Sequence, residues 1–284
     1  MLKPKKYIAS LKRSGFQLAK KNFIRVHHKS IADNIYHCCV QKTASQWIKA
    51  ILNDHRVYKY SGLITYDYEG TRPEGHDARK LTEKTISIVM PHKVIVTPLY
   101  LDFTSFGTIP KPNKYRAFFV ARDPRDIIVS WYFSAKISHT VMGSVGEIRT
   151  KLNEMDIEDG LKYSIRNLEE YGLFQAMQSW IDASKIDPNV LMVKFEKLTA
   201  SDQLFFFREL FAHLDIRMPE NILKDLLADH SFKKKTRGRE QGQEDQASHF
   251  RKGISGDWRN YFNNRVEKYF NDITGNLLAQ LKYE

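Results

Sequence analysis

The chain has few cysteines and no long apolar run. Its two cysteines, Cys38 and Cys39, are adjacent, and neighbouring strand side chains point to opposite faces, so we expect no disulfide between them. They are interpreted as small buried residues in a reducing compartment. No stretch reaches the ~20 apolar residues of a membrane span, and Lys12-Arg13 interrupts any signal-peptide core. The sequence predicts a cytoplasmic protein without stable membrane insertion; the basic extension over residues 1–30 suits a weak peripheral membrane contact.

Internal repeats and low-complexity tracts are also absent, and the histidines form no ligand-spaced cluster with the cysteines, so no metal site is expected. Acidic residues are outnumbered, 33 against 45 lysines and arginines, which gives a formal charge of +12. A field of this sign attracts polyanions: nucleic acid, an anionic membrane surface or a highly phosphorylated small molecule. The 284 residues, 42% of them hydrophobic, are enough for one large domain spanning 1–284.

Apolar, β-prone runs alternate with segments of helical periodicity. Strands are expected at 35–40, 93–97, 117–121 and 190–195, the second of them stopped by Pro98. Helices are expected from 45, from 123, and at 172–184, 201–213, 219–229 and 264–281. Continuously apolar strands separated by helices predict an α/β domain with a mostly parallel sheet flanked by helices.

Two stretches show no sustained period. Residues 58–80 are polar, aromatic and glycine-bearing, which suits a substrate-facing loop. Residues 233–250 are charged and almost devoid of aliphatic side chains. We interpret this second stretch as a mobile loop or lid.

The first strand is followed without a gap by a polar turn and then by a helix. Such a turn aims backbone N–H groups and the positive end of the helix dipole at one point. Lys42 adds a charge there, and Thr43, Ser45 and Gln46 add donors. The arrangement resembles a P-loop in its physics, although the pattern G-x-x-x-x-G-K-[ST] is absent. The alternative is an ordinary β–α turn that carries a lysine.

A second polar segment follows the strand 117–121. Arg122 stands at the strand end, Asp123 is an expected helix cap with Pro124 after it, and Asp126 follows three residues past the cap. Ser130 comes two turns later, roughly 11 Å along the helix axis, and shares a phosphate with Arg122 only if the long arginine reaches across. In the alternative, Arg122 pairs with Asp126.

The third segment combines Arg251 and Lys252 with Gly253, whose missing side chain lets a phosphate approach the backbone. The alternative is a solvated charge run, but Trp258 follows close behind a glycine turn and suggests an ordered anchor. Each of the three segments suits one phosphate. Together they indicate a ligand with phosphates at both ends.

These residues resemble the cytosolic-type sulfotransferases, which use 3'-phosphoadenylyl sulfate (PAPS) and release adenosine 3',5'-bisphosphate (PAP). The first segment is similar to the family's 5'-phosphosulfate loop, the second to its 3'-phosphate site, and Phe250 to Trp258 to its C-terminal signature. The resemblance covers about residues 35 to 262 and implies a P-loop-like, metal-independent transferase. By that resemblance the phosphosulfate is held by Lys42, Thr43, Ala44, Ser45 and Gln46, the 3'-phosphate by Arg122, Ser130, Arg251, Lys252 and Gly253, and the adenine by Trp47, Tyr171 and Phe232, with His230 at its border.

Two positions depart from the family pattern. Ala44 stands where the family has glycine, so the backbone there avoids a positive φ or is strained. The family's catalytic histidine, expected just after the strand before the 3'-phosphate site, has no counterpart in residues 96–102.

Sulfuryl transfer needs alignment, stabilisation of the leaving group and a base for the acceptor. We assign leaving-group stabilisation to Lys42. Asp102, at the carboxyl end of its strand, is the first candidate for the base. His92 precedes that strand and is expected at its amino end, away from the edge where ligands bind. His55, His76 and Glu69 lie in or near the loop that is expected to face the acceptor, and the sequence does not rank them.

The sequence therefore predicts transfer from PAPS to a small-molecule hydroxyl in preference to an amine, and no nucleic-acid partner. A nucleotide kinase is the first alternative and lacks its Walker glycines. A non-enzymatic nucleic-acid-binding protein is the second. The sequence is compatible with a homodimer, whether the enzyme is a sulfotransferase or a kinase.

Overall fold

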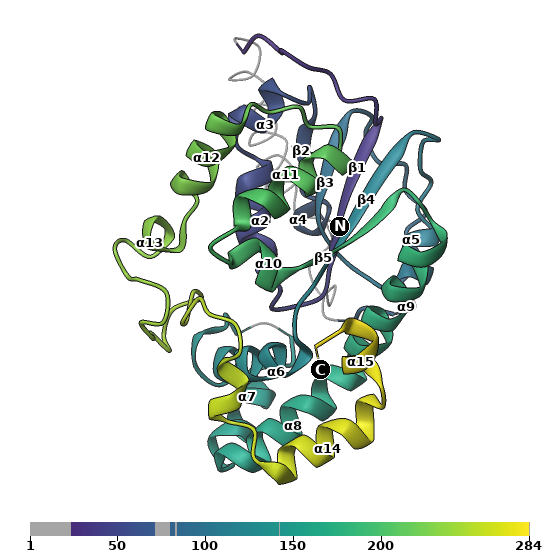
Figure 1. Cartoon of the computed structure of the whole chain (residues 1–284). Helices are drawn as coiled ribbons and strands as arrows, with labels where there is room; N and C mark the ends of the chain where they lie inside the picture. Colours follow the sequence, from purple (N-terminus) through teal and green to yellow (C-terminus); the bar gives the residue numbers. More distant parts are fainter. Residues whose placement is uncertain (1–23, 72–79, 83, 142, 284) are drawn as a thin grey trace, which may run out of the picture.

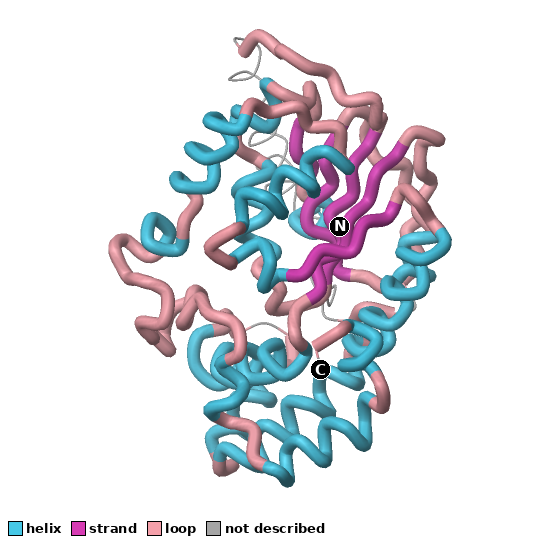
Figure 2. The backbone as a smooth tube through the Cα atoms, viewed as in Figure 1, coloured by secondary structure: helices cyan, strands magenta, loops and turns pink. Residues whose placement is uncertain are grey.

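The computed structural model describes residues 24–71, 80–82, 84–141 and 143–283. Most of the basic extension at 1–30 therefore lies outside the described residues. The described chain is built on a five-stranded sheet of order β2-β3-β1-β4-β5, in which every pair is parallel (Figures 1 and 2). The strands are β1 (Asn34–Cys39), β2 (Ile64–Tyr66), β3 (Val94–Tyr100), β4 (Tyr115–Ala121) and β5 (Val190–Lys194).

Helices cover both faces of the sheet and gather below the carboxyl ends of its strands (Figure 1). One face carries α2 (Ser45–Leu52), α3 (His55–Lys59), α10 (Phe195–Thr199), α11 (Gln203–His213) and α12 (Glu220–Asp229). Helix α13 (Phe232–Lys235) follows α12 and stands away from the sheet (Figure 1). The others are α4 (Tyr68–Thr71), α5 (Phe103–Gly107), α6 (Pro124–Phe133), the π-helix η1 (Ser134–Ser138), α7 (Val145–Asn153), α8 (Ile157–Glu170), α9 (Leu173–Ile186), the 3-10 helix η2 (Asp257–Asn260), α14 (Asn264–Thr274) and α15 (Leu277–Leu281).

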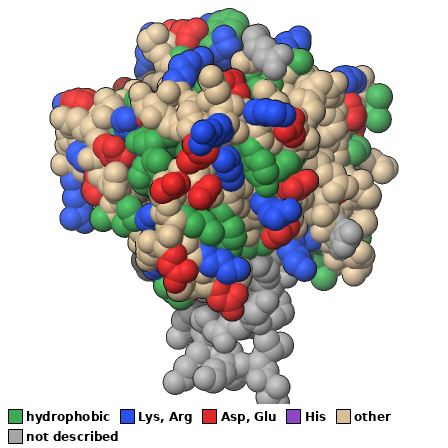
Figure 3. Space-filling model, turned by 90° about the horizontal axis from the view of Figure 1, so that it is seen from below, with side chains coloured by type: hydrophobic (Ala, Val, Ile, Leu, Met, Phe, Trp, Pro, Cys, Tyr) green, Lys and Arg blue, Asp and Glu red, His purple; other side chains and the backbone are tan. Residues whose placement is uncertain are grey.

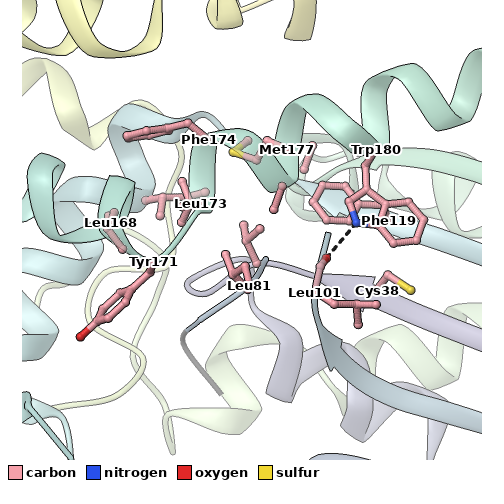
Figure 4. Packing of buried hydrophobic residues seen from close by; sticks show 14 of the residues in the cluster. Cys38, Leu81, Leu101, Phe119, Leu168, Tyr171, Leu173, Phe174, Met177 and Trp180 are labelled. Atoms are coloured by element: carbon pink, nitrogen blue, oxygen red, sulfur yellow. Dashed lines mark hydrogen bonds between the residues drawn. The ribbon is translucent and has the colours of Figure 1, made fainter. Parts of the chain in front are cut away.

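Successive strand residues enter two separate cores, as a sheet buried on both faces requires. In β4, Phe118 packs with the core under α2 and α11, while Phe119 packs with the core under α9. Trp180 of α9 stacks on Phe119 with ring centroids 5.2 Å apart, and its Nε1 donates to the Leu101 carbonyl at 2.9 Å (Figure 4). This anchor fixes the chain just beyond β3, where site residues were expected.

The predicted parallel α/β fold is confirmed, and Cys38 and Cys39 are free, buried thiols as expected. The predicted stop of a strand at Pro98 is wrong, since β3 continues to Tyr100. Proline lacks an N–H for the ladder, and the pairing of β1 with β3 shifts register between Tyr36 and Cys38, opposite the proline. A local irregularity thus absorbs Pro98 without ending the strand.

Other differences concern short or late elements. The stretch 58–80 contains β2 and α4 besides loop. Helices α7 and α8 were not anticipated, and the single helix expected at 264–281 is divided at Gly275, whose φ is +58°. None of the described helices is long and apolar enough to span a bilayer.

His37 is a buried titratable group in the middle of β1. Its Nδ1 lies 2.8 Å from the Thr97 hydroxyl, and its ring stacks on Phe118 with centroids 4.8 Å apart. Burial lowers the pKa of His37 to about 3, so the imidazole is neutral in the folded protein at neutral pH. Unfolding releases it to its ordinary pKa near 6.5.

We predict that His37 makes the fold sensitive to mild acid. Below pH ~6.5 the unfolded chain binds a proton that the folded chain does not, so stability falls as pH drops from about 6.5 toward 3, by about 2 kcal/mol at pH 5. Urea unfolding at pH 7.5 and pH 5 measures this, with His37→Gln as the non-titrating comparison. Equal losses in the wild-type and variant chains would show that His37 does not carry the effect.

Candidate active site

The three polar segments of the sequence meet at the carboxyl edge of the sheet, and Arg122 joins the first to the third. Its Nη1 donates to the Lys42 carbonyl at 2.9 Å, and its Nη2 donates to the Ile254 carbonyl at 3.3 Å. The guanidinium carbon lies 4.6 Å from the centre of the Phe195 ring. One side chain at the end of β4 therefore positions both the turn after β1 and the C-terminal segment.

The start of α6 holds the same C-terminal segment from another side. The Asp126 carboxylate accepts from Gly256 N at 2.6 Å and from Trp258 N at 3.0 Å. These bonds replace the alternative in which Asp126 serves chiefly as an ion-pair partner of Arg122. Ser130 follows Asp126 by four residues on α6 and so lies on the same face of that helix.

The expected helix cap at α6 is present in a modified form. Asp123 is the cap and accepts from Arg125 N at 2.9 Å. The Asp123 backbone N–H donates to Glu196 Oε1 at 2.9 Å. In a capping box this N–H would bond the Asp126 carboxylate, which here binds the C-terminal segment. The Asp at the third helical position thus binds a distant loop instead of closing the capping box.

The turn after β1 has left-handed backbone at two residues that are not glycine. Lys42 has φ of +63° and Ala44 has φ of +57°. Of the two possibilities for Ala44, the strained one is the one observed, and strain of this kind costs about 1–3 kcal/mol per residue. The Thr43 hydroxyl donates back to the Val40 carbonyl at 2.8 Å, and Ser45 shares a 2.6 Å hydrogen bond with the Tyr100 hydroxyl. These bonds hold the turn in its strained form.

Lys42 lies within a cluster of cations. Burial, together with the charges of Arg122 and Arg251, lowers the pKa of Lys42 to about 8. The first, second and third segments each contribute one of these three cations. An anion bound among them would restore a full charge on Lys42.

Asp257 balances the two cations of the third segment. Its side chain is 2% exposed and accepts from Lys252 Nζ at 2.6 Å, from Arg251 and from Asn260 Nδ2 at 2.9 Å. Burial acts to raise the pKa of Asp257, but these hydrogen bonds outweigh it and the net shift is downward. Arg251 and Lys252 are therefore ordered by a buried carboxylate, in place of the solvated charge run that was the alternative.

Three of the four predicted adenine contacts stand beside the first and third segments. Trp47 Nε1 donates to the His230 carbonyl at 2.7 Å. The ring of Phe232 covers Gly253, where an added Cβ would lie 2.4 Å from the ring carbons. Gly253 has φ of +69°, so both its conformation and its neighbour favour glycine.

Tyr171, the fourth predicted adenine contact, packs against α6 and the start of α7. Its hydroxyl lies 3.0 Å from the Ser144 hydroxyl, and its ring packs edge-on against Trp131. Phe195 was not anticipated, although it stacks on Arg122 at the carboxyl end of β5. The rule that ligands bind beyond strand ends, applied to residues 190–195, identifies it.

The candidates for the base occupy different places. Asp102 is 4% exposed and caps α5, accepting from Ser105 N at 2.8 Å. His92 is exposed and precedes β3, and His55 is a largely exposed partner of Asp54 on α3. His76 lies outside the described residues. Glu69 Oε1 accepts from Tyr100 N at 3.4 Å.

The stretch 233–250, the expected lid, is folded onto the third segment. Arg239 donates to the carbonyls of Gln243, Phe250 and Arg251 at 2.7 to 3.0 Å. Glu244 pairs with Arg251. The stretch is thus connected to a predicted phosphate ligand through hydrogen bonds.

Within the part of the chain that is described, no group of three or more His, Cys, Asp or Glu side chains is placed to bind a metal ion.

Comparison with solved structures places the fold. The chain is similar to the mouse sulfotransferase SULT7A1 complexed with PAP, with a TM-score of 0.57 and 18% identity over 90% of each chain. It is also similar to retinol dehydratase in a complex with retinol and PAP, with a TM-score of 0.51 and 20% identity over 86% of this chain and 81% of the other. No curated protein matches in sequence. A model of the sulfotransferase domain matches residues 5–282, and the chain therefore belongs to the sulfotransferase family as an enzyme that takes its sulfuryl group from PAPS.

Proposed function

We propose that PAPS binds with its 5'-phosphosulfate in the turn after β1 and its 3'-phosphate between α6 and the third segment. The observation that supports this most directly is the position of Arg122, which bonds Lys42 and Ile254 at once. Lys42, Thr43, Ala44, Ser45 and Gln46 would receive the phosphosulfate. The 3'-phosphate would be received by Arg122, Ser130, Arg251, Lys252 and Gly253, and the adenine would lie against Trp47, Tyr171, Phe232 and His230.

In the proposed reaction the sulfuryl group passes to an acceptor hydroxyl in line with the departing 5'-phosphate oxygen. Charge develops on that oxygen as the bond breaks, and a fixed cation stabilises it. Lys42 supplies this cation. A carboxylate near the end of β3, Asp102 or Glu69, takes the acceptor's proton.

The acceptor is proposed to be a small molecule with a hydroxyl group, and no nucleic-acid partner is proposed. On the face of the protein shown in Figure 3, acidic and basic side chains mix with apolar ones and form no single basic surface. The kinase alternative is not retained, because the sulfotransferase model matches nearly the whole chain. A cytoplasmic location is proposed from the two buried, unoxidised cysteines.

We predict that Arg122→Ala removes the preference for PAP over ADP, which lacks the 3'-phosphate. A hydrogen bond to a charged group contributes about 1.5–3 kcal/mol, equivalent to a loss of about 10- to 150-fold in affinity for PAP. Affinity for ADP should change less. Isothermal titration with both nucleotides measures the ratio.

Arg116→Ala is the matched control, since Arg116 stands on the same strand and bonds Asn189 far from the site. This variant should keep the preference for PAP. A wild-type chain that binds ADP as tightly as PAP would contradict the proposed site.

We also predict that PAP affinity falls at alkaline pH through Lys42. The anion binds the protonated lysine, and with a free-enzyme pKa of about 8 the affinity should drop about tenfold between pH 7 and pH 9. Lys42→Arg keeps its charge over this range, so its PAP affinity should be flat. A fall of the same size in both proteins would assign the effect to another group.

Gly253→Ala should weaken both the fold and PAP binding. The added Cβ collides with Phe232 and forces an alanine to φ of +69°, for which we expect a loss of about 1–3 kcal/mol in stability. Gly275→Ala, at φ of +58° with nothing within 4 Å, imposes backbone strain without the collision. Urea unfolding and PAP titration of both variants separate the effects, because only Gly253→Ala should lose PAP affinity.

A further inference from the structure

The last residue of β3 connects the phosphosulfate loop to a carboxylate. Tyr100 pairs with Cys39 in the register of β3 and β1, so it stands beside the strand that leads into Lys42. Its hydroxyl lies 2.6 Å from the Ser45 hydroxyl. The tyrosine ring therefore points from the end of β3 toward the loop that is proposed to receive the transferring group.

Glu69 lies at the other end of the same residue. Helix α4 follows β2, the neighbour of β3, and Glu69 Oε1 accepts from the Tyr100 backbone N–H at 3.4 Å. Tyr100 thus contacts Ser45 through its hydroxyl and Glu69 through its backbone N–H. Glu69 is partly buried, on the side of the sheet edge where the strands end.

The groups around Glu69 favour a role as proton acceptor for Glu69 itself. Tyr100 and Cys39 face it from β3 and β1, and burial is the main factor that raises the pKa of each of them, so both stay protonated at neutral pH. Lys84, 9% exposed, donates from Nζ to the Tyr100 carbonyl and places a cation nearby. Tyr100 and Cys39 are therefore poor proton acceptors, which leaves the carboxylate of Glu69 among these neighbours.

The other described candidates make their contacts elsewhere. The Asp102 carboxylate caps α5 by accepting from Ser105 N. If this carboxylate moved to serve as the base, the first turn of α5 would lose its cap. His92 stands at the amino end of β3. Of the described candidates, Glu69 is the one whose side chain bonds a residue that also contacts the phosphosulfate loop.

We propose that Glu69 is the general base of the sulfuryl transfer, with Tyr100 as the positioning residue between it and Ser45; this rests on the proposed function. The acceptor's O–H proton passes to the Glu69 carboxylate as the acceptor oxygen bonds to sulfur. The bond from sulfur to the 5'-phosphate oxygen breaks, and its electron pair leaves with PAP. The products are the sulfate ester, PAP and a protonated glutamic acid, which returns its proton to water.

The test compares two phenols as acceptors, 2-naphthol and 4-nitrophenol, with PAPS as donor. Glu69→Gln keeps the shape of the side chain and removes its basicity, so kcat with 2-naphthol should fall about 10²- to 10⁴-fold. The loss should be much smaller with 4-nitrophenol at pH 8, because this phenol ionises near neutral pH without a base. The PAP affinity of this variant should equal that of the wild type. The acidic limb of the wild-type pH profile of kcat/KM should be absent from the profile of the variant.

Asp67→Asn is the matched control, since Asp67 lies two residues away and pairs with Lys49. It should retain activity toward both phenols. Asp102→Asn serves as the rival arm: if this change removes the acidic limb and Glu69→Gln does not, the base is Asp102. Equal losses of Glu69→Gln with both phenols, or full activity with 2-naphthol, would overturn the proposal.

Failure of the proposed function itself would look different. A wild-type chain that binds PAP but transfers to neither phenol would contradict hydroxyl transfer, and with it the role of Glu69. A wild-type chain that does not distinguish PAP from ADP would contradict the donor site before any base is considered.

Discussion

The donor site depends on one guanidinium that bonds two backbone carbonyls from segments about 210 residues apart in the chain. Arg122 binds the carbonyls of Lys42 and Ile254 while its plane lies against Phe195. A planar group with several N–H donors suits this task, and a lysine could not reproduce it. Because β1 and β4 are neighbours in the sheet, the end of β4 is the natural place from which to reach both segments.

Such an arrangement gathers like charges, and the fold compensates with buried carboxylates. Asp257 orders Arg251 and Lys252, and Asp126 fixes the backbone that follows them. Burial lowers the pKa of Lys42, and repulsion from the charges of Arg122 and Arg251 lowers it further. An anionic donor would relieve that repulsion, so part of its binding energy comes from charges that the fold has already brought together.

The sequence sufficed for features that are contiguous in the chain. One such feature is the strand before Lys42 with its turn and α2. It was predictable because the apolar strand, the polar turn and the periodic helix follow one another without a break. The Asp123 cap was equally local. Contacts made across the sheet were not predictable: Asp126 fits a capping box by spacing, yet its partners are Gly256 and Trp258, some 130 residues on.

The other features that the sequence did not predict lie in short elements or arise from residues that meet only in space. Strand β2 has three residues and α4 has four, too few to show a period, so the connection of Glu69 to Tyr100 was invisible in the sequence. Phe195 illustrates the same limit, since it follows a regular strand and only the sheet order places it beside Arg122.

Pro98 links the irregular strand to the question of the base. The register shift that admits the proline lies between Tyr36 and Cys38, and beyond it the pairing resumes with Leu99 opposite Cys38 and Tyr100 opposite Cys39. The resumed register brings Tyr100 level with the end of β1, where its hydroxyl meets Ser45 and its backbone N–H meets Glu69. A chain without the family's histidine thus has a carboxylate from α4 at the same edge of the sheet, held in place by a strand that continues past its proline.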